Sequence, residues 1–293
     1  MKPASSGQLK NYICLFWSFE FGHRRWGFDK SRFIKYFRNA DVKNRETGKA
    51  EPRRRHFKLN SWLGVWDGSG AQVLQVFGRP DRRLYPQLIS DPTLTVNFKV
   101  QALIYPVLQA LDFLTPSYQQ NQDVPILYRP LMVQFWLEYL GADASLEPLL
   151  LANNHSSLDQ PGISAATRSK LNWTALLPAE RRKSFQQVVK ETGSGGLVGK
   201  LPGLTDVRAA PLLAEQDVLR RTPKAYVMTC EFDVLRDDGL MYVRRLRDAG
   251  VAVTSDHYED GFHGCMAFAF LPVMSSVGQR SLNNYIRWLD QNL

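Results

Sequence analysis

An aspartate and a histidine, Asp233 and His263, each lie in a loop that follows a short apolar segment in the last third of the chain. Residues 224–230 are apolar and include Tyr and Val, which predicts a buried strand. Residues 251–258 alternate like a second strand and lead into the turn 261–264. An Asp that orients a His, which in turn takes the proton of a nucleophile, is the acid–base part of a hydrolase triad. The residue types therefore predict acyl transfer.

A helix between the two strands has to position these loops. Its apolar residues recur at helical spacing over residues 237–249, acidic residues lie at its start, and Gly250 is placed to end it. Two parallel strands joined by a helix release their loops at the same carboxyl edge of the sheet. Asp233 and His263 are therefore expected to lie within hydrogen-bond reach. The alternative is that Asp233 only caps the helix and His263 is an ordinary loop histidine.

The amino-acid sequence of this region resembles that of the hormone-sensitive-lipase branch of the α/β-hydrolases. The resemblance is carried by TCEFDVLRDDG, EDGFHGCM, ALIYPVLQALDFLTPSYQQN, NNHSSLD, LNWTALLPA and YIRWLDQNL, and it covers about residues 88–293. It implies the C-terminal portion of an α/β-hydrolase, with Asp233 as triad acid and His263 as triad base. The chain order of acid before base agrees with that fold. His257 is the rival base, but it falls inside the second predicted strand.

The expected fold class is α/β, a mostly parallel sheet flanked by helices. Residues 98–105 supply a third buried strand, and helices are expected over 130–140 and 281–291. We divide the chain into residues 1–86, an irregular, basic, aromatic-rich segment of unknown fold, and residues 87–293, the α/β-hydrolase C-terminal region.

The basic character of the chain belongs to its first third. The chain of 293 residues carries a net charge of +9, and residues 1–90 hold 18 Lys and Arg against 7 Asp and Glu. Basic residues that alternate with aromatic residues can form a surface on which single-stranded nucleic acid stacks. No recognised nucleic-acid motif frames them, so nucleic acid is not the expected partner. A cluster of basic residues of this kind more commonly belongs to a segment that is simply exposed to solvent.

The nucleophile is the part of the triad that the sequence does not supply. The related enzymes carry a Ser in G-x-S-x-G between a strand and a helix, and an HGGG-type oxyanion loop upstream. The nearest candidate here is Ser69, which has Asp67 two positions before it and Ala71 two positions after it. The HGGG pattern is absent from the sequence. We therefore expect impaired ester hydrolysis.

No metal or cofactor is expected. Cys14, Cys230 and Cys265 are too few for a disulfide framework and lack metal-ligand spacing. Cys230 is interpreted as a buried small hydrophobe. Cys265 is close enough to the His263 loop to lie near the site, although packing is its simpler role. Residues 194–200 resemble a phosphate loop but lack its first Gly and its final Ser or Thr.

Two N-glycosylation patterns begin at Asn154 and Asn172, and both side chains are expected to be exposed. His155, inside the first pattern, is interpreted as a surface residue. The resemblance implies the lumenal face of the endoplasmic reticulum membrane, and a membrane surface stays open as a partner. No anchor segment is visible in this sequence, because the apolar run 12–21 is too short and contains Glu20.

Three interpretations of function follow. The first is a carboxylic ester hydrolase for apolar lipid esters that uses a serine acyl-transfer mechanism. The second is a catalytically inactive hydrolase remnant that binds lipid or a partner protein. The third is a basic nucleic-acid-binding arm on such a remnant. The sequence leaves open whether the chain is an active enzyme, which acyl chains it prefers and how it oligomerises.

Overall fold

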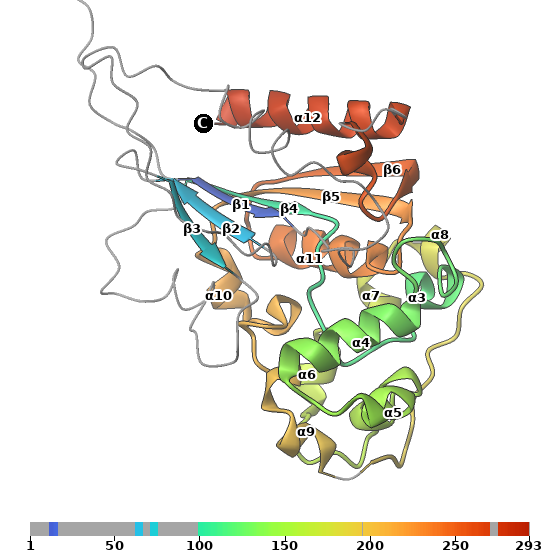
Figure 1. The fold of residues 1–293 in the computed structure, drawn as a ribbon. Helices are drawn as coiled ribbons and strands as arrows, with labels where there is room; N and C mark the ends of the chain where they lie inside the picture. The colour runs from blue at the N-terminus through green and yellow to red at the C-terminus, as the bar shows by residue number, and fades with distance from the viewer. Residues whose placement is uncertain are drawn as a thin grey trace, which may run out of the picture.

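A single twisted sheet forms the centre of the described structure. The computed structural model describes residues 12–16, 62–66, 71–75, 99–194, 196–269 and 275–292, the first three ranges by their backbone alone. Within these residues the sheet has the strand order β3-β2-β1-β4-β5-β6 (Figure 1). The strands are β1 (Tyr12–Phe16), β2 (Trp62–Trp66), β3 (Ala71–Gln75), β4 (Val100–Ile104), β5 (Lys224–Phe232) and β6 (Val253–Phe262).

The part of the sheet that carries the predicted site is parallel. β4 pairs with β5, and β5 with β6, all in parallel register. All five residues of β4 are buried, as expected for a strand covered on both faces. The predicted parallel part of an α/β sheet is therefore confirmed for these three strands. β6 runs to Phe262, further than predicted, so His263 follows the strand directly.

The other part of the sheet comes from the N-terminal segment. β1 pairs in parallel with β4, whereas β1 with β2 and β2 with β3 are antiparallel. The segment expected to be irregular thus contains three short strands, whose backbone extends the sheet beyond β4. The rest of residues 1–86 lies outside the described residues.

Two helices cover opposite faces of the parallel strands. α11 (Arg236–Asp248) lies on one face and α12 (Ser276–Asn292) on the other (Figure 1). β5 supplies alternate residues to the two sides: Ala225 and Val227 pack in the core under α11, and Tyr226 and Met228 pack with residues of α12. This alternation follows from the two-residue period of a strand.

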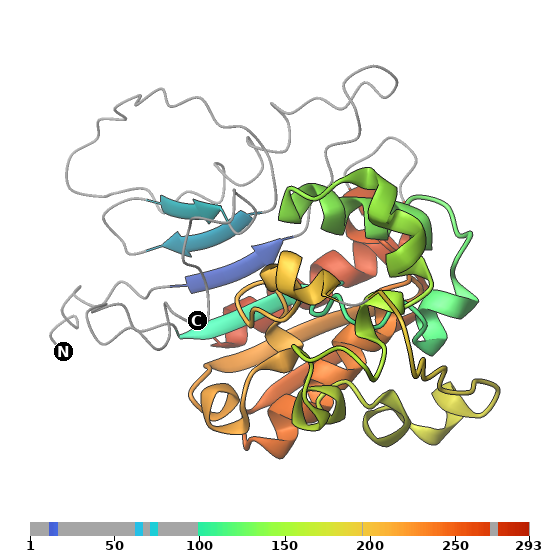
Figure 2. The ribbon, with the colours of Figure 1, turned by 90° about the horizontal axis from the view of Figure 1, so that it is seen from below.

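A layer of short helices separates β4 from β5 in sequence. It packs below α11 in Figure 1 and crosses the face of β4–β6 in Figure 2. None of the described helices combines the length and apolarity that a membrane span requires. The layer contains α3 (Pro116–Gln120), α4 (Arg129–Leu140), η1 (Ala144–Leu146), α5 (Glu147–Leu151), η2 (Asn154–Ser156), α6 (Ala165–Ser169), α7 (Trp173–Leu176), α8 (Ala179–Arg182), α9 (Leu197–Lys200), η3 (Pro202–Leu204), η4 (Pro211–Leu213) and α10 (Gln216–Arg220).

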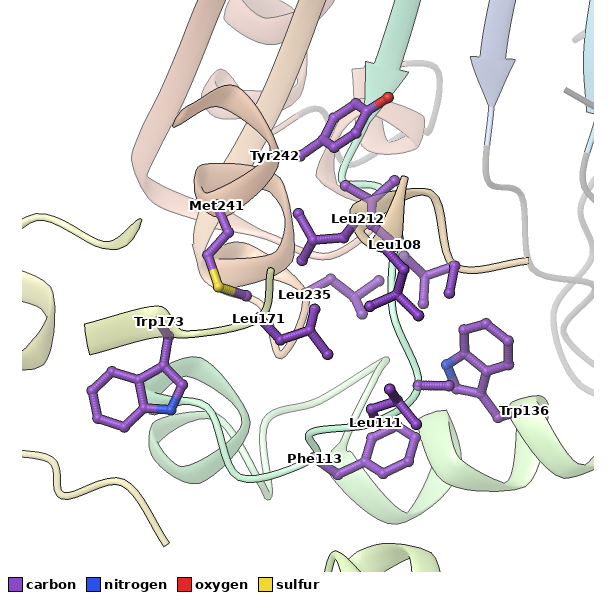
Figure 3. Packing of buried hydrophobic residues seen from close by; sticks show 14 of the residues in the cluster. Leu108, Leu111, Phe113, Trp136, Leu171, Trp173, Leu212, Leu235, Met241 and Tyr242 are labelled. Atoms are coloured by element: carbon purple, nitrogen blue, oxygen red, sulfur yellow. The ribbon is translucent and has the colours of Figure 1, made fainter. Parts of the chain in front are cut away.

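Aromatic and aliphatic side chains join this layer to α11. Trp136, Phe113 and Trp173 are almost completely buried, and they surround the same apolar interior as Met241 of α11 (Figure 3). A buried aromatic side chain removes a large apolar area from water. The short helices therefore owe their order to this cluster more than to helix propensity, which is marginal for helices of four or five residues.

Gly239 allows α11 to lie close to β5. A Cβ at this position would come within 2.4 Å of Thr229 Cγ2. We expect Gly239→Ala to lower the free energy of unfolding by about 1–3 kcal/mol, because the helix or the strand must shift to relieve the overlap. Chemical denaturation of the purified protein measures this.

Gly199→Ala is the matched control, because a Cβ at Gly199, in helix α9, has nothing within 4 Å. It should leave stability unchanged or raise it by up to about 1 kcal/mol. Equal effects of the two substitutions would contradict the close approach of α11 to β5.

Candidate active site

Asp233 and His263 meet at the carboxyl edge of the sheet. Asp233 follows the last residue of β5 and His263 follows the last residue of β6. Asp233 Oδ2 lies 2.9 Å from His263 Nδ1, and the two residues are 0% and 1% exposed. The predicted proximity is confirmed, and its cause is the predicted one: the parallel crossover through α11 brings both loops to one edge.

The backbone around Asp233 holds its carboxylate in place. Oδ1 accepts the N–H of Leu235 at 2.9 Å, which leaves Oδ2 aimed at the imidazole. Asn121 Nδ2 donates to the carbonyls of Asp233 and Glu231, each at 3.0 Å. A carboxylate oxygen can only accept, so the Nδ1 of His263 carries a proton and Nε2 is its basic nitrogen. This is the tautomer that a general base in a hydrolase triad needs.

Tyr105 is a neighbour of His263 that no motif in the sequence indicated. Its ring centroid lies 4.8 Å from that of His263, at a tilt of 56°. It follows β4, precedes Pro106 and has φ 37°, a left-handed value that is rare for a bulky residue. Burial, followed by nearby Cys265 and Cys230, raises the pKa of the Tyr105 phenol well above its usual value. The sequence held one signal, an aromatic residue between a buried strand and a proline.

Buried acids at the start of α11 anchor the loop that carries Asp233. Asp237 Oδ2 accepts the Ser117 N–H at 2.6 Å, and Ser117 Oγ donates to the Val234 carbonyl at 2.6 Å. Asp238 accepts the Leu108 N–H at 3.1 Å and an N–H of Gln109 at 3.0 Å. Burial raises the pKa of Asp238 to about 8. The sequence placed these acids at a helix start, where they complement the helix dipole; the structure adds that they bind the segment after β4.

His257, the rival base, is committed to a different cluster. It lies within β6, as predicted, and its Nδ1 is 2.9 Å from Thr229 Oγ1. Its Nε2 is 3.1 Å from Glu231 Oε2, and Glu231 also pairs with Arg181 of α8 and with Arg236. Burial and then the charge of Arg181 lower the pKa of His257. This cluster ties the short-helix layer to the end of β5 and the middle of β6.

Ser69 lies outside the described residues. The strands on either side of it, β2 and β3, pair antiparallel with Trp66 opposite Ala71. A nucleophile elbow instead connects a strand to a helix. Here the first described element after Ser69 is a strand, β3, whereas an elbow is followed by a helix.

The two glycosylation patterns are half-buried, not fully exposed as expected. Asn172 Oδ1 caps α7 by accepting the Thr174 N–H at 3.2 Å. Asn154 precedes His155, which is 0% exposed, so the prediction of a surface histidine is wrong. His155 Nε2 donates to the Ala110 carbonyl at 2.9 Å, and burial lowers the pKa of the imidazole to about 4. The chain folds back on itself here, which a local pattern cannot reveal.

The acids and histidines at this edge pair with each other and with arginines. Among the residues that the structure describes, no group of three or more His, Cys, Asp or Glu side chains is arranged to hold a metal ion.

The amino-acid sequence is similar to that of known hydrolases. The family model described as alpha/beta hydrolase fold matches residues 195–267, which include Asp233 and His263. The chain is 51% identical over 227 residues to neutral cholesterol ester hydrolase 1 of Bos taurus, covering 78% of this chain and 54% of that protein. It is 45% identical over 266 residues to the Mus musculus protein of the same name, and this match covers 90% of this chain and 61% of that protein. It is 46% identical over 207 residues to arylacetamide deacetylase of Bos taurus, covering 71% and 50%.

The coverage of these matches adds two facts. The chain spans about half the length of the curated relatives it matches. The match to the mouse protein covers a larger share of the chain than residues 88–293 make up, so the similarity begins earlier than the sequence motifs indicated.

Removing the Asp238 carboxylate tests whether it anchors the segment after β4. We expect Asp238→Ala to lower the free energy of unfolding by about 2–4 kcal/mol, because the buried Leu108 N–H and Gln109 amide lose their acceptor. Urea denaturation measures the change. Asp217→Ala removes an exposed carboxylate paired with Arg221 and should change stability by less than about 0.5 kcal/mol. Similar losses in the two variants would contradict the anchoring role.

The depressed pKa of His155 predicts how stability depends on pH. Below its ordinary value of 6.5 the unfolded chain protonates this histidine, whereas the folded chain keeps it neutral until about pH 4. Its contribution to stability is therefore present above pH 6.5 and is lost as the pH falls towards 4, by up to about 3 kcal/mol.

His155→Gln keeps a donor for the Ala110 carbonyl but cannot titrate. Its free energy of unfolding should fall less than that of the wild type between pH 6.5 and 4.5, as measured by denaturation at each pH. Parallel pH profiles for the two proteins would show that His155 is not kept neutral.

Proposed function

The chain has the α/β-hydrolase fold and is related to neutral cholesterol ester hydrolase and arylacetamide deacetylase; from this premise we propose that it carries the acid–base part of a carboxylic ester hydrolase. The observation that carries the proposal is the buried 2.9 Å contact between Asp233 Oδ2 and His263 Nδ1. In such a mechanism Asp233 orients the imidazole and stabilises its charged form. His263 takes the nucleophile's proton through Nε2 and later gives it to the leaving alcohol.

The proposed substrates are apolar esters. The name of the first group of relatives specifies a cholesterol ester, and a site for such a molecule needs apolar walls and few polar groups. The layer of short helices supplies buried Trp136, Phe113 and Trp173, in a cluster that α11 connects to the carboxyl edge of β5 (Figure 3). The resemblance also implies that the region of α4 borders the acyl pocket.

We further propose that this chain on its own is a severely impaired esterase. The sequence contains no HGGG-type loop, and Ser69 is preceded at −2 by Asp67. A carboxylate at that place would oppose both the tight turn of an elbow and the negative charge of a developing oxyanion. Loss of one oxyanion donor alone reduces the rate by about 10²–10³, and loss of the nucleophile acts on the same chemical step.

The proposed location is the lumenal face of the endoplasmic reticulum membrane. The resemblance to the hormone-sensitive-lipase branch implies this location. The presence of two N-glycosylation patterns, at Asn154 and Asn172, supports it.

The activity of the purified chain tests the proposal. We expect it to hydrolyse a short-chain aryl ester roughly 10⁴-fold or more slowly than the bovine neutral cholesterol ester hydrolase assayed beside it, because an enzyme without its nucleophile keeps only positioning. Ser69→Ala and His263→Ala should leave this residual rate unchanged, and a fluorophosphonate probe should not label the chain.

His257→Ala serves as the control for loss of a histidine from β6 without loss of the Asp233 contact. Rapid hydrolysis that both Ser69→Ala and His263→Ala abolish, and His257→Ala does not, would overturn the proposed impairment. It would also identify Ser69 as the nucleophile.

A further inference from the structure

Two cysteines from different elements meet beside the Asp233–His263 pair. Cys230 belongs to β5, and Cys265 begins the short helix η5 (Cys265–Ala269), two residues after His263. Their sulfur atoms lie 3.6 Å apart, and both residues are 0% exposed. Neither forms a disulfide. From this contact we propose that Cys230 and Cys265 are an oxidisable dithiol that a hydroperoxide converts into an internal disulfide, which joins the end of β5 to the loop that carries His263.

The geometry favours this pair over two separately buried thiols. A disulfide needs sulfur atoms about 2.05 Å apart, so a closing movement of roughly 1.5 Å makes the bond. β5 is held between β4 and β6 by parallel pairing, whereas η5 is a single short helix after a glycine turn. Gly264, between His263 and Cys265, has φ +82°, a left-handed conformation that glycine adopts readily because it has no Cβ. The movement therefore falls on η5 and is passed to His263.

Packing around the sulfurs directs them towards each other. A Cβ at Gly261 would lie 2.8 Å from Cys230 Sγ, so the backbone at the end of β6 closes one side of this sulfur. Cys230 and Cys265 belong to the same apolar cluster as Tyr105 and Met266. Because neither residue is exposed to solvent, the oxidant has to be small, which selects a hydroperoxide over another protein's dithiol.

The two sulfurs have different roles in the proposed reaction. The hydrogen bond between them raises the pKa of the Cys230 thiol, together with burial, and lowers the pKa of Cys265. The Cys265 thiolate attacks the distal oxygen of the hydroperoxide, the O–O bond breaks, and the departing alkoxide or hydroxide takes up the thiol proton. Cys230 then attacks the resulting sulfenic acid, the S–O bond breaks and water leaves. In total, two thiols and one hydroperoxide give one disulfide, one alcohol or water, and one further water.

Treatment of the folded 293-residue chain with hydrogen peroxide tests this site independently of ester hydrolysis. After oxidation, quenching and alkylation under denaturing conditions, mass mapping should find a peptide pair linked through Cys230 and Cys265 that dithiothreitol releases. The midpoint of thermal unfolding should rise by several degrees, because the bond closes a loop across 35 positions of the chain.

Cys14→Ser is the matched control, because it removes the one cysteine that is not part of the proposed pair. This variant should give the same linked peptide and the same stabilisation as the wild type. Cys230→Ser removes the resolving thiol, so dimedone added on unfolding after the peroxide has been quenched should label Cys265, and the thermal midpoint should not rise.

Three results would overturn the proposal. One is that all three cysteines of the folded chain are still alkylated after a peroxide treatment that does oxidise the unfolded chain. Another is a disulfide that includes Cys14. The third is oxidation of Cys265 to sulfinic acid in the wild type without a link to Cys230.

Discussion

The parallel crossover from β5 through α11 to β6 is the constraint on which the rest of the site depends. It brings Asp233 and His263 to one edge of the sheet, although each belongs to a different strand end. The crossover is tight because Gly239 lets α11 lie against Thr229. A helix held further from the sheet would change the distance between two loops whose hydrogen bond must stay near 2.9 Å to hold one tautomer.

The ionisable groups around this crossover are buried, and each has a defined partner. Asp237 and Asp238 accept N–H groups from the segment after β4, while Arg236 pairs with Asp237 and Glu231. A buried charge without partners would be strongly destabilising, so such a network forms in a single geometry or not at all. The cluster thereby couples three separate stretches of the chain to the loop of Asp233. Its role is to specify the position of that loop, which apolar packing alone leaves less well defined.

Tyr105, the two buried cysteines and His263 show how close the carboxyl edge of the sheet lies to the α12 side of the core. Tyr105 contacts His263 through its ring and shares an apolar cluster with Cys230 and Cys265. Its left-handed backbone is strain of the kind that persists where the surrounding structure holds a residue firmly.

The sequence by itself determined the elements and the two loops. Apolar runs and helical spacing are local properties, so they predicted the three parallel strands, α11, α12 and the proximity of Asp233 and His263. The tertiary structure alone decided which residues surround that pair. Tyr105, the burial of His155 and the contact of Cys230 with Cys265 depend on segments far apart in the chain, whose packing no local pattern records. The strands β1–β3 were likewise missed, because short strands at a sheet edge are defined by their partners more than by their own composition.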